Sequence, residues 1–98
     1  MALEILWSRL ASKRFDSIHQ YLIKEYGVSS ATLFTKDVFD FLEILSDFPD
    51  IGTIENEWLN TRGFVIERQI TVYYKIRKEK IILLNFYDNR QKPKKKKY

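Results

Sequence analysis

The side chains most capable of chemistry gather around the last apolar run of the sequence and the strand predicted before it. The set is Arg62, Tyr73, Lys75, Tyr87, Asp88 and Arg90. Arginines at the ends of neighbouring strands can hold a phosphate by bidentate hydrogen bonds. A tyrosine beside them can stack on a base or take a proton from a ribose 2′-hydroxyl. In a purely structural alternative, Asp88 and Arg90 pair to close the strand end while Tyr87 packs; spacing alone leaves both open.

The charge of the chain is divided between its two halves. Residues 1–57 hold five Lys and Arg against ten Asp and Glu, a balance of −5, whereas residues 58–98 hold twelve against three, a balance of +9. The basic half contains arginines as well as lysines, and arginine suits phosphate geometry. This favours a face that meets a polyanion; the alternative is that lysines keep an edge strand and the C-terminus soluble.

Several chemistries are excluded by composition or lack support. The 98 residues include no cysteine, which removes disulfides, thiolate metal sites and cysteine nucleophiles. The one histidine, His19, is expected on a helix surface, and three glycines form no phosphate loop. We therefore expect no metal and no cofactor. The first ten residues are too briefly apolar and carry Glu4, so we expect neither a signal peptide nor a membrane span.

Two strands that turn at residues 77–79 are predicted at the centre of the fold. From Gln69 to Ile76 apolar and polar residues alternate, as in a half-buried strand. The run from Ile81 to Tyr87 is apolar at nearly every position, which predicts a central strand covered on both faces.

The preceding residues predict elements that cover this sheet. Residues 3–7 alternate as a short strand, and Ser8 is expected to cap a helix that ends at Gly27. A second helix is expected to be capped by Ser29 or Ser30 and stopped by Pro49. The apolar stripes of the helices are Ala11, Phe15, Ile18, Leu22 and Tyr26, and Phe34, Val38, Phe41, Leu45 and Phe48.

Residues 50–61 are predicted to form a loop, which Trp58 anchors to the globule, before a strand that begins near Phe64. The predicted order is therefore one strand, two helices and a three-stranded meander. This is an α+β fold with a helical hairpin packed on a small, mainly antiparallel sheet. Residues 1–91 form the domain, and the lysine-rich residues 92–98 form a flexible basic tail.

Five blocks of the sequence resemble the RelE/ParE superfamily of toxins. They are ILWSRLASKRFDSIHQYL, FPDIG, Arg62 ahead of a strand, ITVYYKI, and IILLNFYDNRQKP with its Asp-x-Arg-Gln-x-Pro ending. The blocks cover almost the whole chain in the order of the family. Each block is weakly specific by itself, and together they indicate the superfamily more strongly than one activity within it.

The resemblance implies a growth-inhibiting toxin of a type II toxin–antitoxin module, of the plasmid-stabilisation type. Such a toxin is cytoplasmic, has no membrane partner and is neutralised by a cognate antitoxin in a hetero-oligomer. ParE-like members act on DNA gyrase and are not nucleases. RelE-like members cut mRNA on the ribosome.

The resemblance also assigns roles to single residues. In a nuclease, Arg62 and Arg90 would stabilise the scissile phosphate, and Glu55 or Tyr87 would move the proton. In a ParE-like toxin the target contacts would be Arg62, Tyr73, Lys75, Tyr87, Asp88 and Arg90. The loop before Arg62 carries two glutamates in place of basic residues, and no histidine–tyrosine pair ends the chain. This incomplete set favours the ParE-like function.

Overall fold

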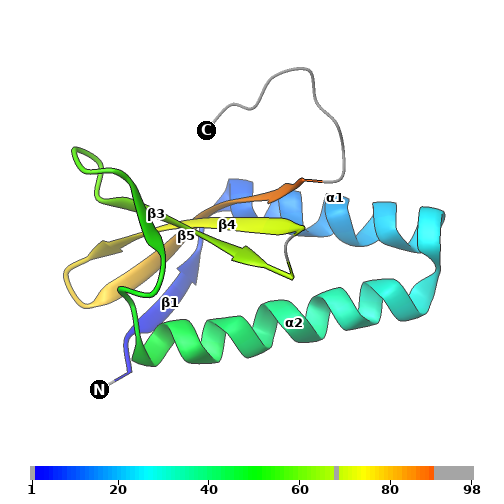
Figure 1. Ribbon diagram of the computed structural model, residues 1–98, viewed down its shortest axis with the longest axis horizontal. Helices are drawn as coiled ribbons and strands as arrows, with labels where there is room; N and C mark the ends of the chain where they lie inside the picture. Colours follow the sequence, from blue (N-terminus) through cyan, green and yellow to red (C-terminus); the bar gives the residue numbers. More distant parts are fainter. Residues whose placement is uncertain (1, 68, 90–98) are drawn as a thin grey trace.

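The computed structural model describes residues 2–67 and 69–89 as two helices packed on a five-stranded sheet (Figure 1). The elements are β1 (Glu4–Trp7), α1 (Arg9–Tyr26), α2 (Val28–Asp47), β2 (Thr53–Asn56), β3 (Thr61–Ile66), β4 (Ile70–Arg77) and β5 (Lys80–Asp88). Arg90 and the basic tail lie outside the described residues. No helix in residues 2–67 and 69–89 is long and apolar enough to cross a membrane.

The strands lie in the order β1-β5-β4-β3-β2, with β4 in the middle. β1 runs parallel to β5, and the other neighbours are antiparallel. Parallel neighbours need a long connection between them, and here both helices and the other three strands separate β1 from β5 along the chain. The predicted α+β fold is confirmed, including the helical hairpin and the turn at residues 78–79 between β4 and β5.

The two helices form an antiparallel hairpin with a single residue between them. Ser8 caps α1 as predicted: its Oγ accepts a hydrogen bond from the Ala11 N–H at 3.0 Å. The prediction that Ser29 or Ser30 caps α2 is wrong, because Gly27 precedes the helix and no side chain caps it. Gly27 has φ +97° and ψ 171°, a conformation that only glycine adopts readily, and this allows the sharp reversal.

The buried core lies between the helices and one face of the sheet. Its fully buried residues include Val72 and Tyr74 of β4 and Ile81, Leu83 and Phe86 of β5. Among the described residues, the intervening side chains of β5 are only half-buried, so the prediction that both faces are covered is wrong. We call the sheet side away from the core the open face; it carries Thr61, Gly63, Tyr73, Lys75, Asn85 and Tyr87.

A bulge in β5 keeps both halves of this strand in phase with the core. Tyr74 pairs with Leu83 but Tyr73 pairs with Asn85, so Leu84 is the extra residue. Ser8 contacts the same place, since its Oγ donates to the Leu84 carbonyl at 3.2 Å. The bulge aims both Leu84 and Asn85 away from the core, which brings a polar residue of the apolar run to the open face.

The predicted loop at residues 50–61 contains an edge strand, β2, which pairs with β3. All four residues of β2 are exposed, so its stability comes from backbone pairing, and it leaves no apolar period in the sequence. The expected anchoring role of Trp58 is also wrong. Its side chain is 96% exposed at the turn between β2 and β3.

Candidate functional site

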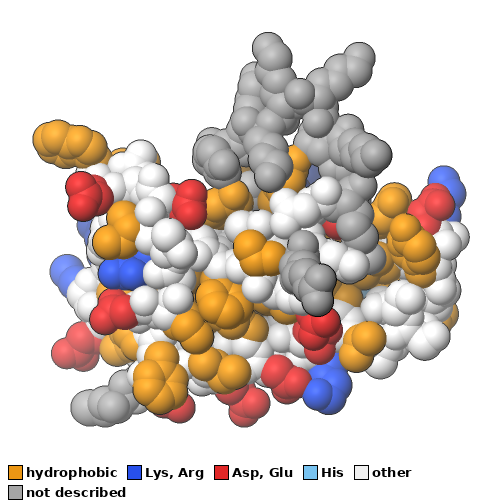
Figure 2. Space-filling view, viewed as in Figure 1, with side chains coloured by type: hydrophobic (Ala, Val, Ile, Leu, Met, Phe, Trp, Pro, Cys, Tyr) orange, Lys and Arg blue, Asp and Glu red, His pale blue; other side chains and the backbone are white. Residues whose placement is uncertain are grey.

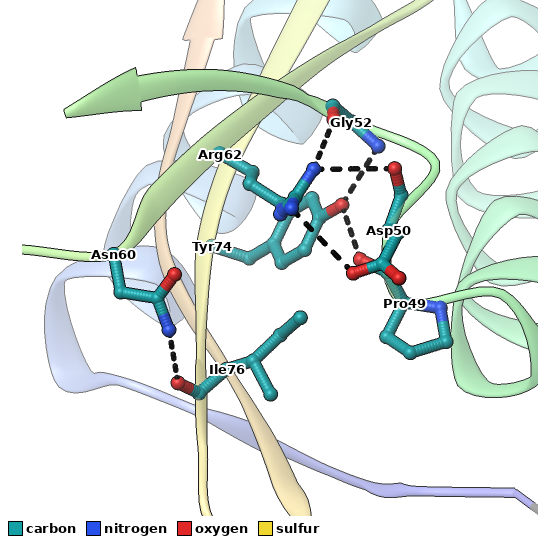
Figure 3. Close-up of polar contacts among 7 residues, drawn as sticks. All are labelled: Pro49, Asp50, Gly52, Asn60, Arg62, Tyr74 and Ile76. Atoms are coloured by element: carbon teal, nitrogen blue, oxygen red, sulfur yellow. Dashed lines mark hydrogen bonds and ion pairs between the residues drawn. The ribbon is translucent and has the colours of Figure 1, made fainter. Parts of the chain in front are cut away.

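Arg62 lies on the core side of β3 and binds the loop that follows α2 (Figure 3). Its Nη1 donates to the carbonyls of Gly52 at 2.8 Å and Asp50 at 3.2 Å. Its Nη2 lies 3.5 Å from an Asp50 carboxylate oxygen; the Arg62 side chain is 18% exposed and that of Asp50 82%. An ion pair with one partner so exposed contributes little. The two carbonyl bonds therefore hold Arg62 and fasten this loop to the sheet.

Tyr74 of β4, which pairs with Arg62, binds the same loop from the buried core. Its hydroxyl donates to the Pro49 carbonyl at 2.8 Å and accepts from the Gly52 N–H at 2.8 Å. Burial raises the pKa of Tyr74, so the phenol stays neutral and keeps its donor. A Cβ at Gly52 would lie 2.7 Å from the Tyr74 hydroxyl oxygen. We call Arg62, Tyr74 and residues 49–52 the loop anchor.

Glu55 and Tyr73 lie next to each other on the open face. A Cβ at Gly63 would be 3.2 Å from Glu55 Cγ and 3.2 Å from Tyr73 Cε1, so the missing side chain lets both pack beside the strand. They line a groove of about 320 Å³ whose walls are mostly apolar. Its lining residues are Leu10, Glu55, Asn56, Leu59, Thr61, Tyr73, Leu84 and Asn85.

Lys75 and Tyr87 are the other predicted site residues on the open face. Lys75 pairs with Thr61 and Ile82, and Tyr87 pairs with Thr71. Both side chains are half-buried. They place a cation and a phenol along the same side of the sheet as the groove.

Asp88 does not lie on the open face. It pairs with Ile70 on the core side and is 4% exposed. Burial and Tyr26 raise the pKa of nearby Tyr21, and the charges of Glu25 and Asp88 add to this effect. The predicted cluster of Arg62, Tyr87, Asp88 and Arg90 is therefore divided: two of its members lie on the core side, one on the open face, and Arg90 outside the described residues.

The arrangement limits the acid–base chemistry of the described residues. Glu55 and Tyr87 face one side of the sheet, whereas the Arg62 guanidinium is bound on the other, so they do not converge on one phosphate. His19 stacks on Phe15 on α1. In residues 2–67 and 69–89 no three His, Asp or Glu side chains gather as metal ligands.

Asn85 and the leucines of the groove were missed in the sequence. The Asn85 Oδ1 is buried and accepts no hydrogen bond from the described residues. A signal was present, since Asn85 is the one amide within the run IILLNFY. Leu10 and Leu59 carry no such signal, because their elements meet the groove only after the chain has folded.

Several solved structures share this fold, and three of them illustrate it. A ParDE toxin–antitoxin system from P. aeruginosa matches with a TM-score of 0.75 at 18% identity, covering 89% of this chain and 96% of the other. A conserved hypothetical protein from Helicobacter pylori gives 0.57 at 17% identity over 90% and 96%. A copper-bound mutant toxin from the same species gives 0.59 at 14% identity over 91% and 97%. These likenesses show the fold, in which two helices pack on a five-stranded, mostly antiparallel sheet.

The sequence profile described as the ParE toxin of the type II toxin–antitoxin system parDE matches residues 5–93. This match spans nearly the whole chain, so the protein belongs to the ParE toxin family. The resemblance found in the sequence blocks is thereby confirmed. A comparison with curated proteins finds no match.

Proposed function

We propose that this protein inhibits growth by binding DNA gyrase and that a cognate antitoxin neutralises it in a hetero-oligomer. Membership of the ParE family supports the toxin and antitoxin parts of this proposal. Gyrase is a cytoplasmic enzyme, so we place the protein in the cytoplasm. Residues 1–91 would form the toxin domain and residues 92–98 a basic tail.

The observation that carries the choice of target is the separation of Arg62 from Glu55. A nuclease that uses a carboxylate base needs a cation at the same phosphate, because the cation must stabilise the charge that develops there. Here the Arg62 guanidinium donates to two loop carbonyls on the core side, and Glu55 lines the groove on the open face. This division favours inhibition by binding over the RelE-like alternative of mRNA cleavage on the ribosome.

The target contacts that we propose lie on the open face. Tyr73, Lys75 and Tyr87 follow one another across β4 and β5 and border the groove or lie beside it. Arg90 and the lysines of the tail would add positive charge toward DNA held by the enzyme. Arg62 would contribute indirectly, by fixing the loop that leads into β2.

The test is a supercoiling assay with purified gyrase, relaxed plasmid and increasing toxin. We expect supercoiling to be inhibited at a saturable toxin concentration, and we expect addition of the cognate antitoxin to restore it. Full gyrase activity at saturating, folded toxin would refute the proposal. Primer extension on translated message, run in parallel, should show no codon-phased cuts; cuts at the ribosomal A site would support the nuclease instead.

A further inference from the structure

The turn between β2 and β3 presents two large apolar side chains to solvent. Trp58 is 96% exposed and Leu59 is 66% exposed. Figure 1 shows this hairpin projecting from the end of the sheet, at the upper left of the view. In Figure 2 a hydrophobic side chain protrudes from the same corner, with acidic side chains beside it. Burial of Trp58 therefore contributes nothing to the fold of this chain.

Hydrogen bonds nevertheless hold this turn in one conformation. The Asn60 N–H donates to the Glu57 carbonyl at 3.2 Å, and the Leu59 N–H donates to Asn56 Oδ1 at 3.1 Å. The Asn60 side chain donates to the Ile76 carbonyl on β4 at 2.8 Å (Figure 3). Asn60 also has φ +51°, which asparagine tolerates better than most residues. The turn is thus preorganised, which reduces the entropy lost when a partner binds it.

The charge of the hairpin indicates what kind of partner it meets. Residues 53–60 contain Glu55 and Glu57 and no Lys or Arg. The nearest arginine in the sequence, Arg62, is part of the loop anchor and donates to the Gly52 carbonyl. Lys75 pairs with Thr61 where the hairpin joins the sheet, but the charged side chains of the tip itself are carboxylates, which favours a protein partner over a phosphate backbone.

The shape of the projecting turn narrows the class of partner further. A projecting tryptophan needs a concave apolar pocket, and tryptophan is among the residues that most often dominate binding at the centre of an interface. A folded enzyme of several domains offers such pockets, whereas a peptide segment that lies along the toxin would fill the groove rather than enclose the turn. The two glutamates call for basic residues at the rim of the pocket.

We propose that Trp58 is the anchor by which the toxin docks into an apolar, basic-rimmed pocket of gyrase. This inference rests on the proposed function and names the side chain that makes the contact. Leu59 contacts the wall of the same pocket and links the anchor to the groove of the open face, which it also lines. The tip inserts as a rigid knob, and gyrase is inhibited through occupancy of that pocket.

The experiment compares wild-type toxin with Trp58→Ala in the supercoiling assay. We expect the inhibitory concentration to rise about 30-fold, the factor that corresponds to loss of a hot-spot contact of about 2 kcal/mol. Trp58→Phe should recover part of the inhibition. Phe48→Ala, at another apolar side chain that is 65% exposed, is the matched control and should leave inhibition unchanged. Circular dichroism should show all variants folded, because neither position is buried.

A second readout follows Trp58 directly. Toxin labelled with 5-fluorotryptophan gives two ¹⁹F resonances, and the one absent in Trp58→Phe belongs to Trp58. On addition of gyrase, this resonance should shift and broaden more than that of Trp7.

Inhibition by Trp58→Ala equal to wild type would overturn the inference and leave the proposed function intact. Loss of antitoxin binding with full inhibition would assign Trp58 to the antitoxin and also overturn it. Failure of wild-type toxin to inhibit gyrase would overturn both.

Discussion

Arg62 and Tyr74 lie opposite each other on β3 and β4, and both direct their polar atoms to the backbone of residues 49–52. The sequence predicts a phosphate contact for Arg62 and places Tyr74 among the apolar positions of its strand. In the structure they replace the hydrogen bonds that the loop carbonyls and the Gly52 N–H would otherwise lose on burial. The two side chains thus hold residues 49–52 in place, and these residues lead into β2.

Replacing Tyr74 with Phe tests the loop anchor. The change leaves the Pro49 carbonyl and the Gly52 N–H without their partner, which should lower the free energy of unfolding by about 1–3 kcal/mol. Urea denaturation followed by circular dichroism measures the difference. Tyr26→Phe, at a tyrosine 56% exposed that hydrogen-bonds the Tyr21 side chain, serves as control and should change stability less than Tyr74→Phe does. Equal stability of Tyr74→Phe and wild type would show that the hydroxyl does not hold the loop.

The same hydroxyl should give the protein an alkaline stability limit. Because the folded-state pKa of Tyr74 is raised, the folded protein retains this proton at pH values where the unfolded chain has lost it. Its contribution is complete below the unfolded pKa near 10 and is lost as the pH rises through the folded value. The free energy of unfolding, measured between pH 8 and pH 11.5, should fall more steeply with rising pH for wild type than for Tyr74→Phe. Parallel curves would contradict this.

At the scale of elements, the hairpin reversal at Gly27 and the bulge at Leu84 set how the layers fit. Gly27 is the single residue between α1 and α2, and its N–H donates to the carbonyls of Leu22 and Ile23 at 3.0 Å each. The bulge keeps Phe86 in the core after Leu83, although an uninterrupted strand would turn it to the open face. The helical hairpin and β5 thus each depend on one residue whose backbone conformation or strand pairing is irregular.

Gly27→Ala and Ser29→Ala together test how the helices are joined. A Cβ at Gly27 meets nothing within 4 Å, so the expected loss of about 1–3 kcal/mol comes from its backbone conformation alone. Ser29→Ala should change stability by less than about 0.5 kcal/mol, because Ser29 does not cap α2. Thermal unfolding of both variants decides. A larger loss for Ser29→Ala than for Gly27→Ala would restore the serine cap predicted from the sequence.

The elements with apolar periods could be predicted from the sequence. Both helices, β4 and β5 bury a face, and the period of that face appears in the residues. β2 could not, because an exposed edge strand held by backbone pairing leaves no period. The candidate site was predicted only in part: Tyr73, Lys75 and Tyr87 reach the open face, but the core-side contacts of Arg62 depend on where the loop after α2 lies.

At the scale of the whole molecule, the fold places two different surfaces on one small protein. The open face holds a largely apolar groove beside Lys75, and the hairpin tip displays Trp58 within residues 53–60, whose charged side chains are Glu55 and Glu57. A protein that acts by binding needs such a surface to be rigid and accessible, whereas a nuclease needs its acid, base and cation to converge. The described residues provide such an accessible surface, and they hold the Arg62 guanidinium on the side of the sheet opposite Glu55.

The most direct test of this account is binding of fluorescently labelled toxin to purified gyrase and, side by side, to ribosomes that carry a message in the A site. We predict a saturable complex with gyrase whose affinity falls as salt rises, because basic residues contribute to it. We predict no saturable complex with the ribosomes. Saturable binding to the ribosomes and none to gyrase would contradict the account.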